Sequence, residues 1–199
     1  KASSRPQMKE DPMTDTLNDP DVVDVLSTDH REALDLIRQI KGTVDAEQRR
    51  DLADTLISEI VRHAVAEEMF VYPAIRKHLP NGEEVAKHDA DEHKELEQAM
   101  KKLEGADADS AEFSQLLDEF ETSLRHHVND EETDQFPELR ARIPREELVE
   151  MAGKVEGAKK LAPTRPHPLA PNSQLFHKLV GPGVGMVDRL RDKLTGRST

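Results

Sequence analysis

Histidine and glutamate residues recur four positions apart at several places in this sequence. Residues with this spacing differ by only about 40° around a helix axis, so both side chains can reach the same ion. Imidazole nitrogens and carboxylate oxygens are common ligands of transition metals. The spacing therefore indicates metal-binding chemistry, and the pairs that show it are His63/Glu67, His88/Glu92, His93/Glu97 and His127/Glu131.

These residues fall within long stretches of helix-forming residues that are separated by glycine and proline. The stretches cover about residues 21–41, 46–79, 83–103 and 110–143, and a shorter one covers 145–161. The sequence lacks the alternating pattern that is typical of strands. Short connections favour antiparallel neighbours, so we predict an all-α fold: an up-down antiparallel four-helix bundle with a short fifth helix and an extended basic C-terminal tail.

Ionisable side chains interrupt the apolar face of each of the four long stretches. A single histidine on such a face is more often an ordinary core residue, but here all four helices share the feature. Buried charges without partners cost several kcal/mol each, so these groups must satisfy one another or something between them. They are His30 in the first stretch, His63 and Glu67 in the second, Asp89 and His93 in the third, and His127 and Glu131 in the fourth.

The number and type of these candidate ligands indicate which metal they suit. Four imidazoles with two or three carboxylates are too many for one tetrahedral zinc ion. They suit a pair of ions such as iron or manganese, with Glu67 and Glu131 placed to bridge the two.

The candidate ligands also belong to an internal repeat. Residues 62–80 match residues 126–144 at an offset of 64, so that a His-x-x-x-Glu-Glu string followed by an aromatic residue and proline occurs twice. Asp29-His30 similarly matches Glu92-His93 at an offset of 63. We therefore predict two helical hairpins related by a pseudo-twofold axis.

With these motifs, the sequence resembles the hemerythrin/HHE cation-binding family over about residues 21–145. The resemblance implies a non-haem di-iron centre (Fe²⁺/Fe³⁺) with an oxo or hydroxo bridge, and it favours iron over manganese or zinc. It implies chemistry toward O₂ or its reduction products. By the same resemblance, His30, His63, His93 and His127 take the terminal-ligand positions, and Glu67 and Glu131 take the bridging positions.

One position departs from the pattern of the oxygen-carrying members. Those proteins have two histidines four residues apart on the third helix, whereas here Asp89 stands four residues before His93. Asp89 is therefore a candidate metal ligand, and the alternative is a cap at the start of that helix. His88 is a weaker candidate because it lies about 100° away around the helix. Tyr72, the only tyrosine, lies five residues beyond Glu67 and could approach the site, but we expect it to pack in the core.

Composition limits the remaining possibilities. The 199 residues include 41 acidic and 28 basic side chains, giving a net charge of −13, and no cysteine. Disulfides, cysteine-ligated zinc and iron–sulfur clusters are therefore excluded. The negative charge argues against nucleic acid as a partner. No apolar run approaches the length of a membrane span, and the first residues have no apolar signal core, so we expect a cytoplasmic protein.

We divide the chain into three parts. Residues 1–20 are predicted to be a disordered lead, residues 21–161 the metal-binding bundle, and residues 162–199 a tail rich in proline and glycine. The tail carries six Lys/Arg against two Asp and contains a short amphipathic stretch. We predict that this stretch forms a helix that docks on the acidic bundle of its own chain, and the alternative is an element that binds a membrane or a partner.

Three functions are compatible with this site. The first is an enzyme that removes peroxide, in the manner of a catalase. The second is a protein that binds, senses or carries O₂, NO or iron without turnover, and the third is a purely structural metal bundle. We favour the first because an aspartate in place of an imidazole stabilises ferric iron and weakens the case for a reversible oxygen carrier.

Overall fold

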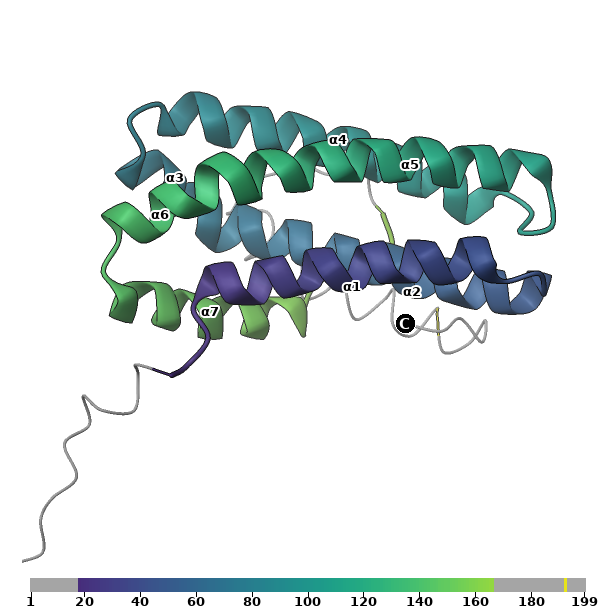
Figure 1. Cartoon of the computed structure of the whole chain (residues 1–199), viewed down its shortest axis with the longest axis horizontal. Helices are drawn as coiled ribbons and strands as arrows, with labels where there is room; N and C mark the ends of the chain where they lie inside the picture. The colour runs from purple at the N-terminus through teal and green to yellow at the C-terminus, as the bar shows by residue number, and fades with distance from the viewer. Residues whose placement is uncertain (1–17, 167–191, 193–199) are drawn as a thin grey trace, which may run out of the picture.

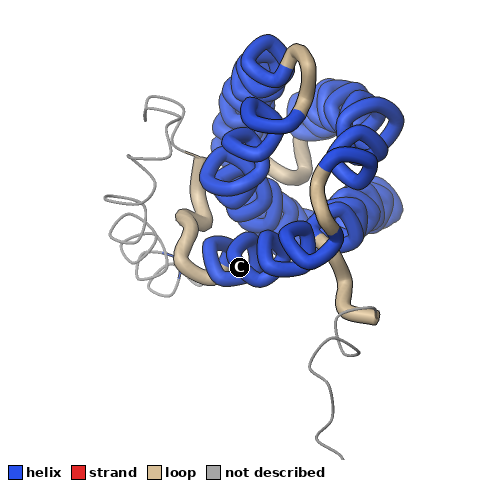
Figure 2. The backbone as a smooth tube through the Cα atoms, turned by 90° about the vertical axis from the view of Figure 1, so that its left-hand side faces the viewer, coloured by secondary structure: helices blue, strands red, loops and turns tan. Residues whose placement is uncertain are grey.

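The computed structural model describes residues 18–166 and Asp192, and all of the regular elements in this part of the chain are helices (Figure 1). An end-on view shows the helices running side by side around a shared interior (Figure 2). This arrangement confirms the predicted all-α four-helix bundle. Its four long helices are α1 (Val22–Gly42), α2 (Ala46–Ala66), α4 (Gly82–Gly105) and α5 (Ala111–Asp130).

Two of these long helices continue through a π-helical turn into a short helix. The turn Glu67–Val71 connects α2 to α3 (Tyr72–His78), and the turn Glu131–Gln135 connects α5 to α6 (Phe136–Arg142). The predicted stretches over about 46–79 and 110–143 are therefore helical along almost their whole length, and each contains one π-helical turn. In both repeats the residue after the aromatic is a proline, which has no N–H to donate to the preceding turn and disfavours regular α-helix there.

The beginning of α1 is fixed by local and distant contacts. Asp21 is the N-cap residue: its carboxylate accepts from the N–H of Asp24, whose side chain accepts from the N–H of Asp21. The same Asp21 carboxylate receives two hydrogen bonds from Arg140 of α6, at 2.8 and 2.9 Å. The capping residue thus ties the first helix to the last part of the second hairpin.

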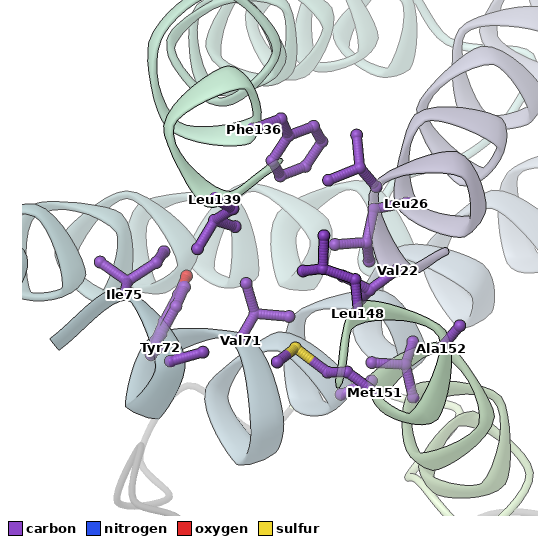
Figure 3. Packing of buried hydrophobic residues seen from close by; sticks show 14 of the residues in the cluster. Val22, Leu26, Val71, Tyr72, Ile75, Phe136, Leu139, Leu148, Met151 and Ala152 are labelled. Atoms are coloured by element: carbon purple, nitrogen blue, oxygen red, sulfur yellow. The ribbon is translucent and has the colours of Figure 1, made fainter. Parts of the chain in front are cut away.

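The core consists of two apolar clusters at opposite ends of the bundle. The α7-end core lies beside α3, α6 and α7 (Figure 3) and includes Val22, Leu26, Val71, Tyr72, Ile75, Phe136, Leu139, Leu148, Met151 and Ala152. The loop-end core lies toward the α1–α2 and α4–α5 connections and includes Ala33, Ile37, Ile40, Leu56, Ile57, Ile60, Leu96, Met100, Leu103, Phe113, Leu117, Phe120 and Leu124.

Ionisable residues separate these two cores. Along α1, Leu26 belongs to the α7-end core and Ala33 to the loop-end core, and the buried His30 lies between them. Along α5 the buried His127 follows Leu124 of the loop-end core. The interruptions of the apolar pattern thus form one polar layer across the middle of the bundle.

The predicted fifth helix forms as α7 (Arg145–Lys159) in spite of its two glycines. It buries Leu148, Met151, Ala152 and Val155, and it packs against α1 and α2. Its last residue, Lys159, places Nζ 2.7 Å from Oδ1 of Asp29 on α1. The fifth helix is therefore attached to the bundle by both apolar packing and charge.

Most of the predicted lead and tail lies outside the described residues, including the predicted amphipathic helix. In the part of the tail that the structure describes, Arg165 contacts Glu104 at the end of α4 at 2.8 Å and Asp192 at 2.6 Å. This segment therefore contacts its own bundle. Within residues 18–166, no helix combines the length and the apolar character needed to cross a membrane.

Gly82 at the start of α4 offers a test of the packing between the two hairpins. A Cβ at this position would lie 2.1 Å from the backbone oxygen of Ile75 and 2.7 Å from Cα of Arg76. We predict that Gly82→Ala lowers the free energy of unfolding by about 1–3 kcal/mol, because backbone must move. In Gly153→Ala on α7 the new Cβ meets nothing within 4 Å, so stability should rise by about 0.5–1 kcal/mol. Urea denaturation of both variants measures this contrast, and equal effects would contradict the described contact.

Candidate metal centre

The polar layer brings six of the predicted ligands together. His30, His63, Glu67 and Glu131 form one group in which the donor atoms all lie within 4.8 Å of one another, and Glu67 forms a second such group with His93 and His127. All six residues are buried. The four long helices and the first residue of each π-helical turn supply them, as the repeat in the sequence requires.

The four imidazoles form two pairs that face each other through Nε2. His30 and His63 place these nitrogens 3.3 Å apart, and His93 and His127 place them 3.2 Å apart. Two nitrogens at this separation can bind one ion together, because metal–imidazole bonds are about 2.0–2.1 Å long. Each pair therefore has the geometry of one half of a two-metal site.

Each of the two carboxylates lies between the pairs. Oε2 of Glu67 is 3.2 Å from Nε2 of His63 and 3.2 Å from Nε2 of His93. Oε2 of Glu131 has the same relation to the remaining two imidazoles, at 3.2 and 3.5 Å. Because each carboxylate touches one imidazole of each pair, both are placed to bridge two ions.

The carboxylate oxygens show that a cation fits between these groups. Both oxygens of Glu67 and both of Glu131 are buried, and none forms a hydrogen bond with any described residue. A buried acceptor without a hydrogen bond costs roughly 1–3 kcal/mol, and more when it is charged. Metal ions between the two carboxylates would satisfy these oxygens and the imidazole lone pairs together. The donor set of imidazoles and bridging carboxylates suits iron or manganese.

A second set of carboxylates orients the imidazoles. In every case the contact is made by Nδ1, which leaves Nε2 directed at the centre. The orienting residues are the chain neighbours of the ligands, so the Asp-His, Glu-His and Glu-Glu strings of the repeat already contain them. The distances are 2.9 Å from His30 to Glu132, 3.1 Å from His63 to Asp29, 3.0 Å from His127 to Glu92 and 3.5 Å from His93 to Glu68.

The charges of the metal-free centre are coupled. Burial alone would raise the pKa of Glu67, but the imidazoles of His63 and His93 hold this pKa well below its ordinary value. Burial alone would lower the pKa of His63, whereas the carboxylates of Glu67 and Asp29 raise it to about 10. Imidazolium therefore occupies the place of the cation in the metal-free protein, and metal binding must release its proton.

The two halves of the centre differ at the aromatic residue of the repeat. The hydroxyl of Tyr72 lies 2.9 Å from Nδ1 and 3.2 Å from Nε2 of His93. Phe136, the matching residue, stacks on His30 with ring centroids 5.8 Å apart. Tyr72 therefore packs in the core, as expected, and its hydroxyl also approaches the site, which was the alternative.

A further difference is a buried polar pair beside the centre. Oδ1 of Asp89 accepts a hydrogen bond from Nε2 of Gln135 at 2.8 Å, and its Oδ2 has no hydrogen-bond partner among the described residues. Burial, and then the charge of Glu131, raise the pKa of Asp89 to about 7. The matching positions of the other half are the apolar Leu26 and Val71. The sequence analysis does not identify Gln135. The signal that could have identified it is the alignment of the two repeats, in which Gln135 matches the apolar Val71.

The two weaker candidates occupy different surroundings. The helix α4 begins at Gly82, so Asp89 lies in its second turn and is not the capping residue. Asp89 is fully buried beside the centre but belongs to neither group of converging donor atoms. The structure places His88 on the surface, in a separate cluster with Glu92 and Asp130.

Fold and donor set together define a helical-bundle protein built to bind metal cations. Comparison with known families agrees: residues 21–139 match the family described as "Hemerythrin HHE cation binding domain". An uncharacterized hemerythrin-like protein of Schizosaccharomyces pombe is 33% identical over 174 residues, which cover 87% of this chain and 86% of that protein. The chain therefore belongs to the hemerythrin HHE cation-binding family, which confirms the resemblance that its motifs indicated.

Two more distant similarities were found. The crystal structure of a hemerythrin HHE cation binding domain-containing protein from Mycobacterium kansasii superposes with a TM-score of 0.62 at 24% identity, covering 71% of this chain and 86% of that one. This structural similarity supports the assignment of the helical-bundle fold. A DNA nickase of Nostoc is 22% identical over 141 residues, which are 71% of this chain and 40% of that protein.

The orienting carboxylates can be tested through metal affinity. Asp29 contacts His63 on one side and Lys159 on the other. We predict that Asp29→Asn weakens metal binding by about 10–100-fold, because the imidazole loses the charge that fixes its orientation. Competition with a chelator measures the affinity. Asp35→Asn is the matched control on the same helix, since Asp35 pairs with the exposed Arg38 and Gln39 of α1. Equal affinities in the two variants would contradict this role for Asp29.

Proposed function

We propose that this protein holds two iron ions between Glu67 and Glu131 and removes peroxide, as a catalase does. The observation that carries the proposal is the pair of buried carboxylates that lie between imidazole pairs and lack hydrogen-bond partners in the described chain. The mixture of nitrogen and oxygen ligands suits iron or manganese, and the family to which the chain belongs favours iron.

The space beside the centre supports a very small substrate. A cavity of about 30 Å³ adjoins the candidate ligands His63, His93 and His127. Its other walls are largely apolar and include Ile60, Val61, Leu96, Met100 and Leu124. A water molecule needs roughly 10–15 Å³ of such space, so the cavity accepts molecules of two or a few atoms. This size fits O₂, NO and hydrogen peroxide.

The groups around the centre support turnover of peroxide. Two molecules of H₂O₂ give two of water and one of O₂, a reaction that moves protons as well as electrons. Bound iron would supply the redox chemistry. Burial raises the pKa of Tyr72 well above its ordinary value, so its hydroxyl keeps a proton beside His93. Asp89 and Gln135 provide further polar atoms next to the centre.

Metal analysis and peroxide turnover test this proposal. Protein purified from iron-replete cells should contain close to two Fe per chain and should release O₂ from added peroxide. His63→Ala and Glu131→Ala should each lose iron and at least about 100-fold of the turnover, because outer contacts alone are worth 10–100-fold in affinity. One zinc per chain, unaffected by either change, would contradict the proposal. Two iron ions with a reversible spectral response to O₂ or NO, without turnover, would instead assign binding, sensing or transport.

Asp89 should determine which of these outcomes is seen. We predict that Asp89→His raises the reduction potential, slows peroxide turnover and lengthens the life of an O₂ adduct, because an anion beside the centre is replaced by a neutral ligand. Asp89→Ala should alter the charge-transfer band of bound azide. Asp91→Ala is the control on the same helix, since Asp91 is exposed and pairs with Lys87. If the two alanine variants behave alike, Asp89 has no influence on the centre.

A further inference from the structure

A second cluster of imidazoles and carboxylates lies on the surface of the bundle, where α4 and α5 pack together. Each helix contributes a histidine and an acid four residues apart: His88 and Glu92 on α4, and His126 and Asp130 on α5. Because residues with this spacing lie on the same face of a helix, two adjacent helices can direct four donor groups at one point.

Donor atoms of His88, Glu92 and Asp130 all lie within 4.8 Å of one another, and His126 contacts the same two carboxylates. Nε2 of His88 is 3.4 Å from Oε1 of Glu92 and 3.9 Å from Oδ2 of Asp130. Nδ1 of His126 is 3.4 Å from the same oxygen of Glu92 and 3.3 Å from the same oxygen of Asp130. In a tetrahedral zinc site with bonds of 2.0–2.1 Å, neighbouring donor atoms are about 3.3–3.4 Å apart. Three of the four contacts, at 3.3–3.4 Å, have this spacing, and the contact between His88 and Asp130 is longer, at 3.9 Å.

Ordinary surface ion pairs do not account for this arrangement. An independent pair needs one histidine and one carboxylate, whereas here both histidines contact the same two oxygens. The neighbouring Asp91 lines the same hollow but is engaged by Lys87.

The surroundings allow an ion to enter from solvent. The side chains of His88 and His126 are 58% and 65% exposed, whereas that of Glu92 is only 16% exposed. The hollow they line has a volume of about 290 Å³ and includes Asp91 and Glu95 but no lysine or arginine among its lining residues. Acidic walls of this kind raise the local concentration of cations.

Glu92 connects this cluster to the buried centre. Its Oε1 faces His88 and His126, while its Oε2 lies 3.0 Å from Nδ1 of His127. His127 is one of the buried candidate ligands, so one carboxylate separates the surface cluster from the centre.

We propose that His88, Glu92, His126 and Asp130 form an accessory site for a divalent transition-metal ion of the zinc or ferrous class. An ion held there lies one carboxylate away from His127. The site is distinct from the buried centre, because it shares none of the six buried donor residues.

Zinc binding to the iron-loaded protein tests this site. Zn²⁺ is a suitable probe because iron and zinc can be counted separately in the same sample. We expect equilibrium dialysis at micromolar Zn²⁺ to give one zinc per chain without loss of iron. The double variant H88A/H126A should bind zinc more than about 100-fold more weakly, since removing ligands costs more than the 10–100-fold of outer contacts. It should keep its iron and its thermal stability, because both side chains are exposed.

His78→Ala is the matched control, since it removes a histidine that lies away from the cluster and contacts Glu147. Its zinc affinity should equal that of the wild-type protein. Wild-type protein that binds no zinc, zinc that enters only as iron leaves, or a double variant with unchanged affinity would each overturn the accessory site. A shortage of iron with normal zinc binding would count against the proposed function alone, so the two failures are distinguishable.

Discussion

Two glutamates and four histidines occupy the middle of a bundle that is otherwise held together by aliphatic and aromatic side chains. Charges in such a place are strongly destabilising unless they have partners. Glu67 and Glu131 have no hydrogen-bond donor in the described residues, and the only groups that compensate them are imidazoles. The apolar core is therefore interrupted in the middle of the bundle, where the six candidate metal-binding groups lie together. Its two apolar clusters stabilise the bundle on either side of that layer.

The arrangement around this layer follows from the same constraint. The carboxylates on Nδ1 hold each ring so that Nε2 is directed inward, and the neighbours of the ligands in the chain provide them. The π-helical turns begin at Glu67 and Glu131, the candidate bridging residues, and the prolines that follow disfavour regular α-helix there. Lys159 extends the network to α7, where it offsets the charge of Asp29. A helix outside the four-helix bundle thus supports the electrostatics of the centre.

The sequence was sufficient for the parts of this structure that depend on periodicity. Apolar positions three and four residues apart predict the helices. The ionisable residues that interrupt these apolar faces predict the six candidate ligands, which are His30, His63, Glu67, His93, His127 and Glu131. It was not sufficient for contacts that depend on the rotation of neighbouring helices. The contact between Gln135 and Asp89 depends on the π-helical turn Glu131–Gln135, because such a turn changes how the residues are rotated around the helix axis. His88 is a candidate for the buried centre by sequence alone. Its surface location depends on how α4 is rotated against α5, which the sequence pattern does not specify.

The central claim is that Glu67 and Glu131 are shared by two ions in the polar layer. Anomalous diffraction at the iron absorption edge, from crystals of the iron-loaded protein, tests it most directly. The account predicts two anomalous peaks, one beside His30 and His63 and the other beside His93 and His127, with both glutamates in contact with both. A single peak, or two peaks that do not share these carboxylates, would contradict it.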